Sequence, residues 1–128
     1  MFVQELRHET EQTVRVGVLL KKTNNNPLEP IYGALLNWFY WRYLVKADEA
    51  LVDIVNHEWS DIPCCEGLYY LTFTVLDTSI KGPLTLYIHD DNVLGKPILM
   101  HFMVIDKNTY DSKYGNNLLK TEPEAQLS

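Results

Sequence analysis

Cysteine is almost absent from this chain: the only two are the adjacent Cys64 and Cys65. Neighbouring cysteines seldom bridge each other, because the ring that they would form strains the peptide unit between them. A zinc site built on sulfur is also unsupported, because no second cysteine cluster exists to complete the ligand set. We therefore expect reduced thiols in a loop, with one of them pointing inward.

Positive charge is scarce as well. The chain has 11 Lys and Arg residues against 17 Asp and Glu residues, a net charge of −6, and its longest basic cluster is Lys21-Lys22. An acidic surface repels phosphate backbones, so we expect no nucleic-acid partner. Long apolar runs are missing, and residues 1–7 do not form a cationic leader before a hydrophobic stretch. We therefore expect no membrane partner, and synthesis in the cytoplasm.

Sequence motifs of catalysis are missing too. The chain has no histidine pair at helical i, i+4 spacing, no Gly-x-Ser-x-Gly elbow and no glycine-rich phosphate loop. Its carboxylates cluster at turns, where such side chains normally cap their own backbone. We therefore expect no enzyme, no catalytic residue, no cofactor and no metal site.

Two chemical alternatives remain open. The run Asp90-Asp91-Asn92 offers several oxygen atoms to a hard ion such as Ca²⁺, although it lacks a 12-residue loop signature. A small hydrolase would require His57, His89 and Asp90 to converge in space.

The clearest pattern in the chain is a strand, turn, strand unit over residues 67–88. In its first arm, residues 67–76, Tyr69, Leu71, Phe73 and Val75 share one face. In its second arm, residues 84–88, Leu84, Leu86 and Ile88 do the same. Alternation with period two is typical of half-buried strands, and residues 77–83 between the arms contain turn residues. We expect these arms to form a hairpin at the centre of the fold.

Further strands are predicted around this unit, over residues 13–21, 51–55, 57–59 and 98–106, with a helical turn at 107–115. The first should bury Val14, Val16, Val18 and Leu20, and the last should bury Ile98, Met100, Phe102 and Val104. About seven strands with turn signals every 8–12 residues predict an all-β fold, an antiparallel Ig-like β-sandwich over residues 13–106. Polar termini extend from it, an N-terminal arm at 1–12 and a C-terminal arm or tail at 107–128.

The stretch from Leu35 to Lys46 is unusually aromatic and is predicted to be a strand. One face would carry Phe39, Trp41, Tyr43 and Val45. The other would carry Trp38, Tyr40, Arg42 and Leu44. Tryptophan, tyrosine and arginine are common anchors of protein interfaces, so the second face is the expected partner surface. Exposed Trp38, Tyr40 and Trp59 could instead stack on sugar rings.

The order of several short motifs resembles a family of small bacteriophage and prophage structural proteins. These motifs are Phe2 to His8 followed by Thr13 to Val18, then Gly67-Leu-Tyr69, Leu76-Asp-Thr78 and Lys81-Gly-Pro-Leu84, and finally Phe102 to Ile105, Asn108 to Asp111 and Tyr114-Gly115. The resemblance implies an Ig-like virion domain that serves as a capsid decoration, head-tail adaptor or fibre-attachment module. The chain departs from the family at Val18, where proline is common, and in its heavier aromatic run at 38–43.

Taken together, these patterns predict a non-enzymatic virion structural protein that binds other virion proteins and copies of itself. The polar termini would add strands to neighbouring subunits or wrap them. The interface candidates are Trp38, Tyr40, Arg42, Leu44, Tyr110 and Tyr114. The alternative is a carbohydrate-binding module that recognises a host-surface glycan.

Overall fold

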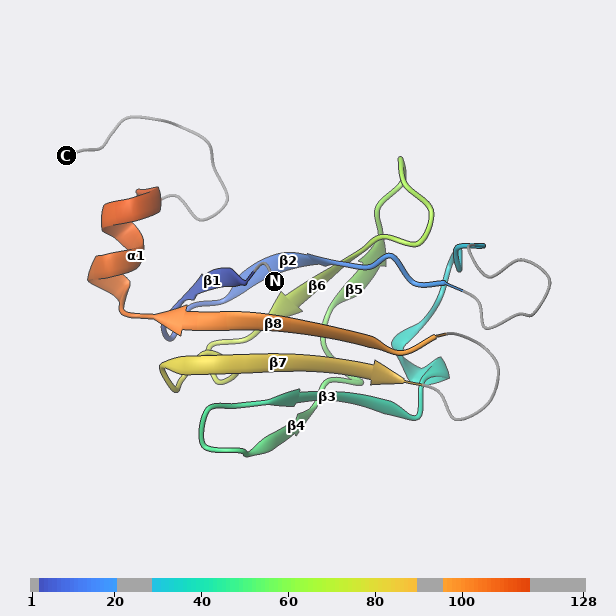
Figure 1. The fold of residues 1–128 in the computed structure, drawn as a ribbon. Helices are drawn as coiled ribbons and strands as arrows, with labels where there is room; N and C mark the ends of the chain where they lie inside the picture. The colour runs from blue at the N-terminus through green and yellow to red at the C-terminus, as the bar shows by residue number, and fades with distance from the viewer. Residues whose placement is uncertain (1–2, 21–28, 90–95, 116–128) are drawn as a thin grey trace.

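The described part of the chain forms two β-sheets that pack face to face, and the short helix α1 follows the last strand (Figure 1). The structure is a computed structural model that describes residues 3–20, 29–89 and 96–115. Its elements are β1 (Gln4–Arg7), β2 (Gln12–Val16), the 3₁₀ helix η1 (Leu36–Trp38), β3 (Trp41–Val45), β4 (Leu51–Asp53), β5 (Trp59–Asp61), β6 (Tyr69–Phe73), β7 (Gly82–His89), β8 (Ile98–Ile105) and α1 (Lys107–Tyr114).

The larger sheet has the strand order β1-β8-β7-β3-β4, and the smaller sheet has the order β2-β6-β5. Every neighbouring pair is antiparallel except β1 and β8, which run parallel. The predicted all-β sandwich is confirmed in this form, with eight strands among the described residues in place of about seven. The helical turn expected near residue 107 is α1.

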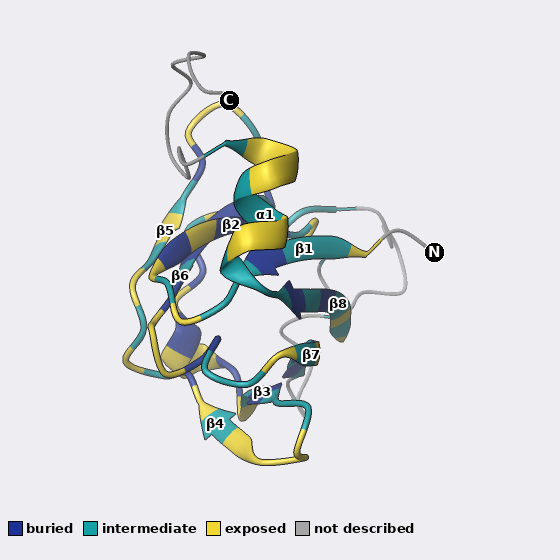
Figure 2. Ribbon diagram, turned by 90° about the vertical axis from the view of Figure 1, so that its left-hand side faces the viewer, coloured by how far each residue is buried: buried dark blue, intermediate teal, exposed yellow. Residues whose placement is uncertain are grey.

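Alternating side chains from both sheets build the core. The inward sets predicted for the two arms are buried, apart from Val75, and so are Phe102 and Val104 of β8. Phe73 of the small sheet meets Phe102 of the large sheet edge to face, with ring centroids 5.2 Å apart. Figure 2 shows buried positions on strands of both sheets, and their side chains form one core cluster. Period-two burial therefore places the core where the sequence pattern predicts it.

The predicted hairpin is wrong, because its two arms lie in different sheets. β6 is the middle strand of the small sheet, and β7 lies in the large one. The connecting turn carries the chain across the core, and the buried Asp77 organises it. Its Oδ2 accepts a hydrogen bond from the Thr74 N–H (2.8 Å) and lies 2.7 Å from His57 Nε2. Turn residues mark a reversal of the chain, but they do not say whether the reversal stays within one sheet.

The predicted N-terminal arm belongs partly to the body of the domain. β1 pairs with β8 at the edge of the large sheet, and Leu6 lies in the core. Gln12 closes the corner between β1 and β2, because its side-chain amide accepts from the Arg7 N–H and donates to the Arg7 and Thr10 carbonyls. Leu6 is the one apolar residue of β1, and a single apolar position is too weak a signal to predict a strand.

The first predicted strand ends earlier than expected, and its inward face changes at Gly17. Val14 and Val16 are buried as predicted, but Val18 is 48% exposed while Leu19 is 1% exposed. Beyond Gly17 the chain leaves the β2–β6 ladder, and the Leu19 N–H donates to the Gly67 carbonyl (2.8 Å). The close approach of the backbones at Gly17 and Gly67 therefore resets the alternation.

Charged and polar side chains attach the helix α1 to β1. None of its eight residues is buried. The Arg7 guanidinium donates two hydrogen bonds to the Asp111 carboxylate (2.9 Å each), and Glu5 accepts from Lys113 (3.0 Å) and from the Tyr114 hydroxyl (2.7 Å).

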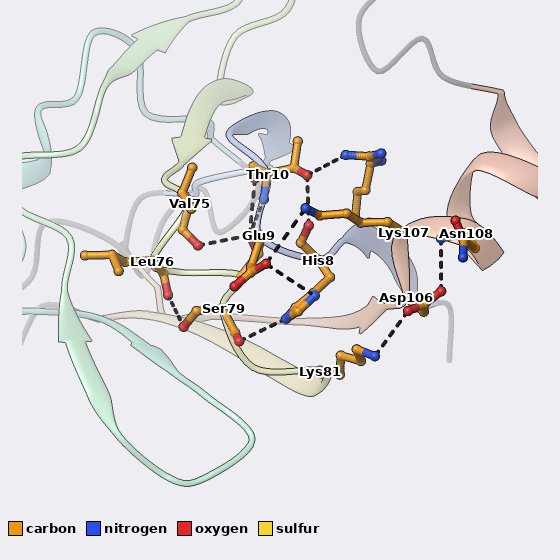
Figure 3. A network of polar contacts seen from close by, with 12 residues as sticks. His8, Glu9, Thr10, Val75, Leu76, Ser79, Lys81, Asp106, Lys107 and Asn108 are labelled. Atoms are coloured by element: carbon orange, nitrogen blue, oxygen red, sulfur yellow. Dashed lines mark hydrogen bonds and ion pairs between the residues drawn. The ribbon is translucent and has the colours of Figure 1, made fainter.

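The start of α1 joins a polar network with two nearby turns (Figure 3). Asp106 caps the helix by accepting from the Asn108 N–H (3.0 Å) and also accepts from Lys81 (3.1 Å). Lys107 lies 3.8 Å from Glu9 in the β1–β2 turn. The predicted C-terminal arm is thus docked on the sandwich as far as residue 115.

Substituting alanine for Gly17 tests the close approach of the two backbones. Gly17 has a φ of +145°, and a Cβ there would lie 2.5 Å from the Gly67 carbonyl oxygen and 2.9 Å from Leu68 Cδ2. We expect Gly17→Ala to lower the free energy of unfolding in urea by at least about 2 kcal/mol. Gly33→Ala is the matched control, because Gly33 also has a positive φ (+71°) but leaves open space around a Cβ. Its cost should be about 1 kcal/mol, and equal losses at both sites would refute the clash.

Acid should release α1 before it unfolds the sandwich. Hydrogen bonds from Tyr114 and Lys113 lower the pKa of Glu5 below its ordinary 4.5, and the Arg7 hydrogen bond lowers the pKa of Asp111 below its ordinary 3.8. A lowered folded-state pKa stabilises docking above the ordinary value, and this contribution is lost as the pH falls through the lowered one.

Amide hydrogen exchange measures this release. Protection of the α1 amides should fall below about pH 4, whereas the β7 amides stay protected. In Asp111→Asn the loss should already be present at pH 7. Unchanged α1 protection at pH 3 in the wild-type chain would contradict an electrostatic attachment.

Candidate interaction surface

The side chain of Tyr69 on β6 fixes the path of the connection between β2 and β3. Its hydroxyl donates to the Ile31 carbonyl (2.7 Å) and accepts from the Ala34 N–H (2.9 Å). All three residues are buried, and burial raises the pKa of the Tyr69 hydroxyl. The Trp59 ring stacks on Tyr69 with centroids 4.7 Å apart, and its indole N–H donates to the Ala34 carbonyl (3.0 Å). Trp59, one of the predicted sugar-stacking residues, therefore holds the fold together.

The aromatic stretch is not one continuous strand. Leu36–Trp38 form η1, and β3 begins only at Trp41. The buried Phe39 anchors the segment between them. The Arg42 guanidinium donates to the Phe39 and Tyr40 carbonyls and lies 3.4 Å from the Asp53 carboxylate, so it ties this segment to β3 and β4.

The structure corrects the predicted partner face of β3. Leu44 is 0% exposed and belongs to the core, so it cannot reach a partner. Arg42 lies on the same inward side, opposite Ile88 of β7, and is half-buried. The error arose because the alternation was extended through residues 35–40, which are not a strand. Trp38 and Tyr40 are nevertheless exposed, since η1 and the turn after it turn them outward.

Four aromatic rings form a grid on the outer face of β3 and β7. Trp41 is paired with His89, and Tyr43 with Tyr87, in the β3–β7 register. Along β3 the Trp41 and Tyr43 ring centroids are 5.7 Å apart, and along β7 those of Tyr87 and His89 are 6.0 Å apart with planes at 23°. Such cross-strand and same-strand contacts hold the rings in a fixed array.

Exposed neighbours enlarge this grid. The Tyr40 ring meets Trp41 edge to face (5.2 Å). Leu99 of β8 lies opposite Tyr87, and Leu51 of β4 lies opposite Val45; both leucines are exposed. We call this set the outer-face aromatic patch; its members are Tyr40, Trp41, Tyr43, Leu51, Tyr87, His89 and Leu99. Of these, only Tyr40 was among the predicted interface residues.

The outer face of the small sheet is different in character. An open hollow of about 320 Å³ lies there, lined by Glu58, Trp59, Ser60, Tyr70 and Thr72. On the neighbouring strand Thr13 shares a hydrogen bond with Thr72 (2.9 Å), and Arg15 is exposed. This face is polar, as expected for an antiparallel sheet with one side in water.

The remaining interface candidates, Tyr110 and Tyr114, lie on α1. Their rings contact each other with centroids 4.5 Å apart, and Tyr114 is also bonded to Glu5. Burial raises the pKa of Tyr110, and the hydrogen bond to Glu5 raises that of Tyr114. Tyr114 is exposed, so it can still reach a partner while α1 is docked.

The chemical alternatives gain no site from the part of the chain that the structure describes. His57 is paired with Asp77 in the turn before β7, whereas His89 ends that strand. In residues 3–20, 29–89 and 96–115 no three His, Cys, Asp or Glu side chains come together as a metal site would require. Asp90, Asp91 and Asn92, the predicted calcium ligands, lie outside these residues.

The prediction of two free thiols is wrong, because Cys64 and Cys65 are joined by a disulfide. They lie in a tight turn in which the Cys65 N–H donates to the Ile62 carbonyl (3.1 Å) and the Leu68 N–H donates to the Cys65 carbonyl (3.1 Å). The turn places the two sulfur atoms next to each other, although a disulfide between neighbouring cysteines closes a small ring that strains the peptide unit between them.

The chain matches no protein-family model, no curated protein and no solved structure. Within its described residues, no helix has the length and apolar character needed to cross a membrane.

Replacing Tyr69 by phenylalanine tests whether its hydroxyl holds the connection in place. The change would leave the buried Ile31 carbonyl and Ala34 N–H without their partner, so we expect the free energy of unfolding to fall by about 1–3 kcal/mol. Tyr70→Phe, on the exposed side of the same strand, is the control and should change stability by less than about 0.5 kcal/mol. If Tyr69→Phe and Tyr70→Phe lowered the free energy of unfolding in urea equally, the buried Tyr69 hydroxyl would not stabilise the connection.

Proposed function

We propose that this chain is a non-enzymatic virion structural protein whose β-sandwich binds neighbouring protein subunits through the outer-face aromatic patch. The observation that carries the proposal is the exposure of aromatic and leucine side chains on one face of the large sheet, over β3, β4, β7 and β8. Contiguous exposed apolar surface of this kind is typical of interaction sites, and tyrosine and tryptophan are the residues most enriched there.

The strand order supports an Ig-like sandwich. In that fold the sheets consist of strands A, B, E, D and of C, F, G, and variable-type domains add C′ beside C. Here β2, β6 and β5 would correspond to B, E and D, while β8, β7, β3 and β4 would correspond to G, F, C and C′. β1 departs from the constant-type arrangement, because it joins the sheet of β8.

The virion setting comes from the resemblance of the ordered motifs to small bacteriophage structural proteins. In a virion, a decoration, adaptor or fibre-attachment module acts by binding neighbouring subunits through its surface. The docked helix α1 offers Tyr114 as a further contact next to the sandwich. Residues 116–128, the outer part of the predicted C-terminal arm, lie outside the described residues.

A carbohydrate-binding module is the second candidate. The observation in its favour is the array of Trp41, Tyr43, Tyr87 and His89, since flat aromatic surfaces can stack on sugar rings. Loss of glycan-array binding in Trp41→Ala would favour this function.

Incorporation into particles tests the proposal. Particles are purified on a density gradient from cells that make a tagged chain, and the tagged chain per particle is measured. We expect Trp41→Ala to reduce incorporation at least about tenfold, since a central aromatic anchor contributes about 2 kcal/mol or more to an interface. Leu76→Ala is the control, because Leu76 is exposed in the β6–β7 turn, away from the patch.

Thermal unfolding checks that both variants remain folded. Equal incorporation of the two variants would refute the role of the patch. Absence of the wild-type chain from particles would refute the virion setting.

A further inference from the structure

We propose that the outer-face aromatic patch is the contact between two copies of this chain, related by a two-fold axis. The inference rests on the proposed function, because it names the partner of the same surface. For such a contact the patch must be uncovered within one copy and must not bring like charges together. It must also offer enough area for a stable interface, and its polar groups must suit a protein surface better than a sugar.

Part of the outer face of the large sheet is apolar, which is typical of a surface that another molecule covers. Outward positions of β3, β7 and β8 include Trp41, Tyr43, Tyr87 and Leu99, whereas the outer face of the small sheet carries Thr13, Arg15 and Ser60 among others. The same chain thus follows the usual polar-outside pattern on one sheet and breaks it on the other.

Among the residues that the structure describes, the cover on this face lies at its far end. α1 packs on β1 at that edge of the sheet (Figure 2). It contacts Glu5 and Arg7 of β1, and its Lys107 lies near Glu9 in the β1–β2 turn. β3, β7 and β4 lie on the other side of β8 from β1. In the described chain the helix therefore leaves the patch open to a partner.

Charge favours a second copy as that partner. Each copy has a net charge of −6, so two copies repel each other over most of their surfaces. The patch contains no aspartate, glutamate, lysine or arginine. Among the described residues, Asp53 lies opposite Tyr43 at the rim of the patch; its carboxylate lies 3.4 Å from Arg42 Nε and accepts from the Val55 N–H (2.9 Å). Two copies can therefore approach through the seven members of the patch without bringing carboxylates of the patch itself together.

The exposed area is of the right order for such a contact. Aromatic side chains bury about 150–250 Å² each when covered fully. In the patch the exposed fractions range from half-buried rings to 64% for Tyr40 and Leu51. Scaled by these fractions, the seven side chains supply about 600–700 Å². A standard interface buries about 800 Å² per partner, which the patch and its rim would reach. In a two-fold arrangement each ring array meets its own copy, and aromatic rings pack well against one another.

The polar rim fits protein better than sugar. A sugar site needs free donors and acceptors beside the rings to bind hydroxyl groups. Here Asp53 is already engaged, and the Thr85 hydroxyl is bonded to His101 Nδ1 (3.3 Å). Beside the described part of the patch, both of these polar side chains thus already have protein partners.

Sedimentation velocity over a range of protein concentrations tests the dimer. The full chain should sediment as a dimer, and Leu99→Asp should weaken the dimer at least about tenfold. The matched control is Leu76→Asp, because Leu99 is 59% exposed on the patch and Leu76 is 72% exposed away from it. The control should remain a dimer.

Two further variants guard against misfolding. Tyr40 lies outside the strands, so Tyr40→Ala should weaken the dimer without disturbing the sheet. Leu99→Lys places the opposite charge at the same position. It should weaken the dimer as Leu99→Asp does, because either charged group would be buried in the contact. Near-ultraviolet circular dichroism checks the fold of each. A monomeric wild-type chain, or a dimer unaffected by all three patch variants, would overturn the inference.

The outcomes separate this inference from the proposed function. A monomer whose incorporation into particles still depends on Trp41 would overturn the dimer and leave the binding function standing. A patch-dependent dimer that never enters particles would support the dimer and refute the virion role.

Discussion

The hydrogen bonds of the Tyr69 hydroxyl are the constraint on which the aromatic surface depends. The connection from β2 to β3 must cross from one sheet to the other, and its backbone groups at Ile31 and Ala34 are buried as it does so. A buried carbonyl and N–H need partners, and one phenol supplies both. With this segment fixed and Phe39 in the core, β3 starts at Trp41. Its register with β7 then brings Tyr43 opposite Tyr87.

The two sheets use the same alternation for different purposes. Inward positions on both supply an apolar core, and the small sheet faces water with threonine, serine and arginine. On the large sheet the outward positions are aromatic near β3 and β7, while those of β1 carry Glu5 and Arg7, which bind α1. One sheet face is thus divided into a charged part that the chain covers itself and an apolar part that it leaves exposed.

The sequence predicted what depends on local alternation and missed what depends on pairing. The inward residues of β6, β7 and β8 follow from period two and were predicted. The outward position of Tyr87 also follows from its neighbours Leu86 and Ile88. The pairing of the strands does not follow from local alternation. The pattern of β6 and β7 predicts a hairpin because a turn separates them, and no local feature assigns them to different sheets. The partner face of β3 was assigned wrongly because the alternation was extended through residues 35–40, which are not a strand.

The two attachments on the large sheet should respond in opposite ways to salt, and this difference follows from their chemistry. α1 is held by Arg7–Asp111 and Lys113–Glu5 pairs that are partly exposed to solvent, so dissolved ions screen them. The aromatic patch has no charged member, and excluded salts strengthen apolar association. Salt also screens the repulsion between two acidic copies. Raising the ionic strength should therefore loosen the helix, whereas it should favour the proposed contact between copies through the patch, so the two effects differ in sign.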